Sequence, residues 1–139
     1  MSVRFVCCAA PDHPLHRLER SLTMEDLKQH RHLVVRDSGT QRSRRVLALE
    51  AEQRWTVSHK ATSIRAACMG MGFAWFAESN IRDELAQGAL RPLPLAEGGV
   101  REGSLYLMHA DRDAAGPGQR HFCACLREII ARDLAGLPG

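Results

Sequence analysis

Two short segments rich in hydroxyl groups could hold a small ligand. Residues 37–40 read Asp-Ser-Gly-Thr and follow a predicted strand, and residues 58–63 read Ser-His-Lys-Ala-Thr-Ser and follow the next one. Each segment opens a predicted helix. In an α/β sheet, ligands bind beyond the carboxyl ends of the strands, where helix N-termini offer free N–H groups to a small anion or carboxylate. The candidate hydroxyl residues are Ser38, Thr40, Thr62 and Ser63.

Helix capping is the simpler explanation for any one of these hydroxyls, because serine and threonine commonly cap helix N-termini. We expect Thr62 or Ser63 to cap the helix that follows. Two such segments in successive strand–helix units nevertheless favour a pocket that both of them line.

The sequence offers no catalytic constellation. Ser38 lacks the glycine two residues before it that a nucleophile elbow needs, and Gly70-x-Gly72 precedes a strand instead of following one. The histidine pairs at 13/16 and 30/32 lie in turns without an acid cluster, so they are interpreted as surface histidines. Glu78 could act as a general base, but it has no paired nucleophile. We therefore expect neither a cofactor nor a metal site.

The composition is that of one soluble domain. The chain has 139 residues, 45% of them hydrophobic and 25% charged, with a net charge of +3. It contains no apolar run of the roughly 18–20 residues that cross a membrane, and its N-terminus does not resemble a signal peptide, so a cytoplasmic location is expected. Its one dense basic cluster, at residues 42–45, does not indicate a dedicated nucleic-acid surface. The five cysteines include no C-x-x-C pair and are interpreted as reduced, packed thiols.

Alternating apolar and helical patterns predict an α/β domain with a mainly parallel sheet. The predicted strands are residues 3–9, 33–36, 54–58, 73–76 and 105–109, with 90–95 as an edge strand or crossover because of its two prolines. Helices are predicted after Thr23, over 41–53, from Thr62 or Ser63, over 81–86 and over 119–134. The last helix carries one apolar stripe, made of Phe122, Cys125, Leu126, Ile129 and Ile130.

The run from residue 3 to residue 134 resembles the C-terminal part of LysR-type transcriptional regulators. VRFVCCAAPDHPL is similar to the family's strand and its P-x-HPL turn, and TMEDLKQHRHLVV is similar to the short helix and strand that follow. TSIRAACMGMGFAWFAESNIRDELAQGALRPLPL is similar to the family's stretch "s…v..G.Gia.lP…v…l..G.L..lpl". LYL and the last helix match the return to the first subdomain. Ala77 departs from the pattern, because the family commonly has proline there.

The resemblance implies a periplasmic-binding-protein-like (type II) effector domain, in which two α/β subdomains enclose a small-molecule pocket. One complete subdomain, residues 32–102, would be flanked by pieces of the other at 1–31 and 103–139. The pocket residues it implies are Ser38, Gly39, Thr40 and Thr62, with Phe73 and Trp75 as weaker candidates because such residues are more often core.

The family's winged helix-turn-helix and the first half of its first subdomain have no counterpart in this sequence. We therefore expect a truncated gene product, an expression fragment or a natural fragment. Residues 3–9, residues 105–109 and the last helix would then have to bury their apolar faces against each other or against another copy, so a homo-oligomer is expected.

The favoured function is an effector-binding sensory domain that recognises a small metabolite, with a carboxylate as one candidate. It would reach DNA only through the winged helix-turn-helix of another chain, and no membrane contact is expected. The first alternative is an interaction module that forms mixed oligomers with full-length regulators without sensing a ligand. The second is an enzyme that uses Glu78 or His59 in the cleft.

Overall fold

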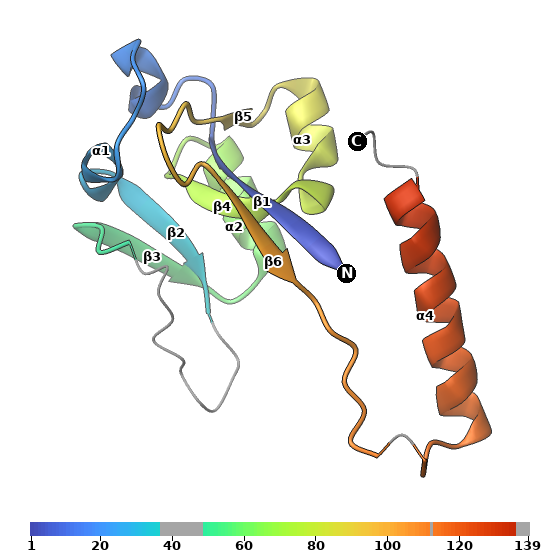
Figure 1. Ribbon diagram of the computed structural model, residues 1–139. Coiled ribbons are helices and arrows are strands. Elements are labelled where there is room, and N and C mark those ends of the chain that lie inside the picture. Colours follow the sequence, from blue (N-terminus) through green and yellow to red (C-terminus); the bar gives the residue numbers. More distant parts are fainter. Residues whose placement is uncertain (37–48, 112, 136–139) are drawn as a thin grey trace. The chain divides into compact units, whose positions relative to one another are not determined.

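The computed structural model describes residues 1–36, 49–111 and 113–135 (Figure 1). It divides into two compact units. The larger unit comprises residues 3–103, and the smaller comprises residues 1–2 together with residues 104–139. We describe each unit by itself.

The larger unit is built on β1 (Ser2–Ala9). β1 pairs in antiparallel fashion with β4 (Ala74–Ala77) and with β5 (Arg91–Pro92), and it also pairs with β6 (Val100–Ser104). β5 lies at a sheet edge and contains Pro92, as expected of a strand with a residue that lacks an N–H donor.

A second pair of strands supplies the parallel part of the sheet. β2 (Arg31–Val35) and β3 (Gln53–Val57) run parallel in unbroken register. A parallel bridge between His32 and Phe73 joins them to the chain entering β4, with Leu33 N–H donating to the Phe73 carbonyl at 2.9 Å. The expectation of a mainly parallel sheet is therefore wrong for the strands around β1, because hydrophobic periodicity carries no information about strand direction.

The helices begin and end largely on local signals. Thr23 caps α1 (Met24–Lys28) in a capping box with Asp26, and Gly88 ends α3 (Arg82–Gln87) with a left-handed φ of 73°. The remaining helices are η1 (Pro14–Leu18), α2 (Lys60–Cys68), η2 (Glu78–Asn80) and α4 (Pro117–Ala135).

Two buried clusters lie on opposite faces of the sheet, because alternate residues of β1 point to opposite sides. Val6 and Cys8 belong to the cluster that α2 and α3 cover. Cys7 and Ala9 belong to the other cluster, which α1 and η1 cover together with residues 93–95. Phe73, on this second face, is completely buried.

Two predicted elements need correction. The predicted helix over 41–53 lies outside the described residues up to position 48, and residues 49–52 are not helical. The predicted strand over 105–109 has no regular structure, and β6 occupies the preceding residues instead. Leu105 exchanges backbone hydrogen bonds with Met1, but the run goes no further as a strand, and Tyr106 and Met108 are 80% and 88% exposed.

The last helix forms as expected, but its apolar stripe is not buried. Phe122 and Ile129 are more than half exposed, and Cys123 is the buried residue of α4 within the part of the chain that the structure describes. The expected burial of this stripe against another element or another copy stays a prediction.

Candidate functional site

The carboxyl ends of β2 and β3 form the edge at which the sequence places a ligand. Val35 lies opposite Val57, and the next N–H along, that of Arg36, donates to the Val57 carbonyl at 2.8 Å. Because the two strands are parallel, their carboxyl ends lie next to each other. Ser38, Gly39 and Thr40 belong to the first of these segments and lie outside the described residues.

The second segment leads into α2 three or four residues earlier than the expected cap at Thr62 or Ser63. His59 occupies the N-cap position with an extended backbone, and its side chain makes no capping hydrogen bond. Thr62 and Ser63 therefore do not cap the helix. Lys60 and Ala61 are good helix formers, so the helix starts directly after the strand and places both hydroxyl residues inside its first turns.

Thr62 and Ser63 differ in accessibility. The Thr62 side chain is exposed, whereas Ser63 is 1% exposed and its N–H donates to the His59 carbonyl at 3.2 Å. Thr62 can contact a ligand at this edge. Ser63 is a core residue and can affect a ligand only through the packing of α2.

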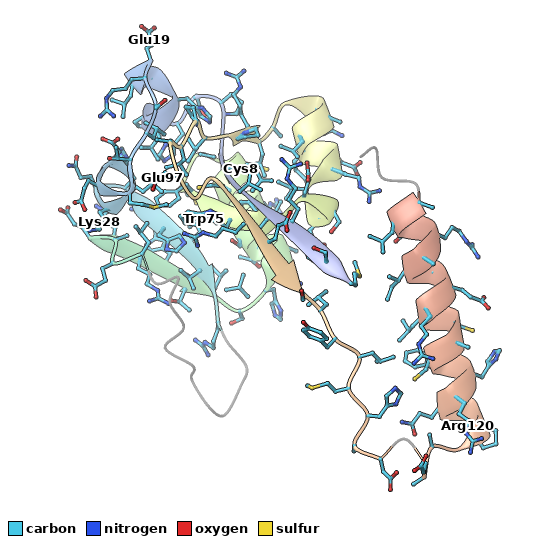
Figure 2. All side chains as sticks on the ribbon, viewed as in Figure 1. Cys8, Glu19, Lys28, Trp75, Glu97 and Arg120 are labelled. Carbon is cyan, nitrogen blue, oxygen red and sulfur yellow. The ribbon has the colours of Figure 1, made fainter. Side chains whose placement is uncertain are left out.

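The two aromatic candidates lie on the opposite face of the sheet from α2. Phe73 is completely buried in the second cluster. Trp75, which is labelled in Figure 2, packs against the same cluster. Trp75 Nε1 donates to the Gly98 carbonyl at 2.9 Å, and the Arg101 guanidinium lies 3.8 Å from the centre of the indole ring. The structure therefore does not bring Phe73 and Trp75 together with Thr62.

His32 is the first histidine for which a surface position was expected and is not found, because its side chain is partly buried. Its ring stacks on Phe73 with centroids 5.2 Å apart and meets Trp75 edge-on at 5.6 Å. Its Nδ1 is buried with no hydrogen-bond partner. Burial lowers the pKa of His32 to about 4, and the positive charges of Arg54 and Arg101 add to this effect. Val34 lies two residues further along β2 on the same face, and this apolar neighbour is the signal that could have indicated partial burial.

His13 is the second histidine for which a surface position was expected and is not found. It is 5% exposed, and its Nδ1 accepts a hydrogen bond from the Leu15 N–H at 3.1 Å, which caps η1. Burial lowers the pKa of His13 to about 4, with a further contribution from the nearby His30 and His16.

These two histidines predict a pH-dependent stability. Histidines in an unfolded chain titrate near pH 6.5, so between pH 6.5 and pH 4 the unfolded state binds protons that the folded state does not. The free energy of unfolding should therefore be highest above pH 6.5 and should fall as the pH approaches 4. The expected loss is only on the order of 2 kcal/mol, because partial exposure of the rings lets solvent screen their charge. Urea unfolding at a series of pH values measures this.

The variant His32→Phe keeps an aromatic ring on Phe73 and removes one of the two titrations. It should lose about half of the pH dependence. A wild-type profile that is flat between pH 4 and pH 6.5 would contradict the burial of both imidazoles.

Within the described ranges, no group of three histidine, cysteine or acidic residues is placed to hold a metal ion. None of the helices in those ranges is long and apolar enough to cross a membrane.

The comparisons with known proteins agree with this architecture. A family model described as LysR substrate binding domain matches residues 1–131. A search of curated protein sequences finds no significant match to the chain.

Solved structures with the same fold are regulatory domains of transcription regulators. That of MetR, a LysR family regulator from N. meningitidis, is 20% identical, with a TM-score of 0.64 over 99% of this chain and 63% of that one. The regulatory domain of an AphB variant from Vibrio vulnificus is 18% identical, with a TM-score of 0.57 over 88% of this chain and 64% of that one. The Synechocystis CcmR regulatory domain in complex with 2-PG is 15% identical, with a TM-score of 0.57 over 93% of this chain and 64% of that one.

The present chain thus spans less than two thirds of each of these three domains. The shared fold is periplasmic-binding-protein-like of type II, as the sequence motifs indicated. Since the family model covers nearly the whole sequence, this chain belongs to the LysR substrate-binding domain family, the effector-binding regulatory domains of LysR-type transcriptional regulators.

Proposed function

We propose that this chain is a sensory domain that binds a small-molecule effector at the carboxyl edge of β2 and β3. The observation that carries the proposal is the in-register parallel pairing of these strands, because it starts both hydroxyl-rich segments from one edge. Binding would shift the population of the domain's conformations and so the geometry of an oligomer, without chemistry on the ligand.

The charges at this edge favour an effector that carries a carboxylate or another anionic group. Arg36 follows β2, and His59 and Lys60 begin α2, and all three are exposed. The first N–H groups of α2 have no partner within the helix, and the helix dipole adds positive potential at this end. The regulatory domain of CcmR, which has the same fold, holds the small molecule 2-PG. That complex supports small molecules as the class of ligand to test on the present chain.

The division into subdomains also remains a proposal. Residues 32–102 would form the complete second subdomain, and residues 1–31 and 103–139 would belong to the first. Contact with DNA would be made by a winged helix-turn-helix, as elsewhere in the family, and a cytoplasmic location would follow from that role.

A thermal-shift screen of small carboxylates and aromatic compounds tests the proposal. A ligand at about 100 times its Kd adds about 2.7 kcal/mol to the stability of the folded state, so Tm should rise by several degrees. Thr62→Ala and Ser38→Ala should each remove most of this shift. Ser21→Ala is the matched control, because Ser21 is an exposed serine before α1, in the chain that leads to the amino end of β2.

The second candidate function is an interaction module, and the exposed apolar run Leu105–Met108 favours it. Leu105, Tyr106 and Met108 are 58%, 80% and 88% exposed, and contiguous exposed apolar residues commonly mark a protein contact surface. Size-exclusion chromatography with light scattering distinguishes the two functions. A silent ligand screen, together with mixed oligomers formed with a full-length LysR regulator, would replace the sensory proposal with this one.

A further inference from the structure

We propose that His121 and Cys125 on α4 form a two-residue binding site for a thiophilic metal ion, of which Zn²⁺ is the representative. The two residues are four positions apart on a 19-residue helix, so their side chains lie on the same face. The Sγ atom of Cys125 lies 3.6 Å from Nε2 of His121.

This separation is the one that a tetrahedral zinc site requires of neighbouring ligands. Zinc binds thiolate sulfur at about 2.3 Å and imidazole nitrogen at about 2.0–2.1 Å, and a tetrahedral angle then places the two ligand atoms roughly 3.6 Å apart. Because one continuous helix holds both residues, the pair keeps this spacing without any rearrangement of the chain. Thiolate and imidazole are also the ligands that Zn²⁺ and Cu⁺ prefer over hard, oxygen-seeking cations.

The pair is accessible to an ion from solution. His121 is exposed and Cys125 is partly exposed. The structure gathers no third histidine, cysteine or acidic ligand at this pair within the described ranges, so water would fill the remaining coordination positions. On binding, the Cys125 thiol loses its proton to solvent and the metal–sulfur bond forms, with no change in the oxidation state of either atom.

The neighbouring thiol of α4 has a different environment. Cys123 is 6% exposed and lines a hollow of about 400 Å³ within the smaller unit. Arg120, which lies near the start of α4 in Figure 2, and Arg127 line the same hollow. His109 and Asp113 also line this hollow, but among the described residues they form no group with Cys123 that is placed to hold a metal ion, so Cys123 is a natural control for Cys125.

Titration of the reduced 139-residue chain with Co²⁺ tests the site, because thiolate ligation gives cobalt a sulfur-to-metal charge-transfer absorption in the near ultraviolet. We expect this absorption in the wild type and its reversal by Zn²⁺. It should be lost in Cys125→Ser, and in His121→Ala the affinity should fall at least about tenfold because the chelate is reduced to one ligand. Cys123→Ser should leave the absorption unchanged.

Circular dichroism of each variant shows whether α4 is intact. His121 and Cys125 are at least partly exposed, so their substitution should preserve folding. The proposal is overturned if the wild type shows no thiolate absorption, or if the absorption survives in Cys125→Ser. An unchanged affinity in His121→Ala would also overturn it and would leave only a hydrogen bond between thiol and imidazole. None of these outcomes depends on effector binding, so the test is independent of the proposed sensory function.

Discussion

Replacing Phe73 with alanine should lower the free energy of unfolding by about 3–5 kcal/mol. Phe73 is completely buried, packs with Cys7 and Leu27 in the second cluster, and stacks against His32. Its backbone also joins β2 to the chain entering β4. Truncation would leave a cavity where the two parts of the sheet meet, and domains of this size are stable by only about 5–15 kcal/mol.

Urea unfolding followed by circular dichroism measures this effect, and Phe122→Ala is the matched control. Phe122 is 62% exposed on α4, so the same truncation there should change stability by no more than about 0.5 kcal/mol. Similar losses at the two positions would show that Phe73 does not hold the sheet together.

The elements that could be predicted from the sequence are those whose signals are local. Thr23 with Asp26 three residues later specifies a helix start, and Gly88 supplies the left-handed residue that ends a helix. β1 was recognisable as a short run of apolar residues that is buried on both faces. Each of these features depends on a few neighbouring residues and not on the rest of the fold.

The errors concern interactions between distant residues. Antiparallel pairing of β1 with β4, and the absence of a strand at residues 105–109, depend on which segments meet in space. The burial of His32 likewise depends on Phe73 and Trp75, 41 and 43 positions further along the chain.

Of the candidate site, only the sheet edge at the ends of β2 and β3 could be predicted from the sequence. The order of strands along the sequence predicted that the segments after β2 and β3 start from one edge, and the parallel register shows that the two strand ends are adjacent. The start of α2 at Lys60 could not be fixed in the same way, because His59, Thr62 and Ser63 can each precede or enter a first turn. Family motifs were needed to connect this edge with an effector.

Replacing Gly72 with alanine should destabilise the domain by up to about 3 kcal/mol, although the same substitution at an open position is stabilising. A Cβ atom at Gly72 would lie 2.5 Å from the carbonyl oxygen of Arg31 and 3.1 Å from Cγ of Leu33. That carbonyl accepts the N–H of Phe73 at 3.1 Å, so it cannot move away without breaking the junction between β2 and the chain entering β4.

Gly118→Ala supplies the comparison, because Gly118 lies in α4 and a Cβ atom there would meet nothing within 4 Å. Alanine in a helix is favoured over glycine by about 0.5–1 kcal/mol, so this variant should keep or raise the helical stability of α4. At Gly72 the added methyl group meets the backbone of another element, whereas at Gly118 it meets nothing. If Gly72→Ala were as stable as the wild type in urea, residues 31–33 could not lie as close to residues 72–73 as the structure has them. That result would also contradict the junction between the parallel strands and the strands around β1.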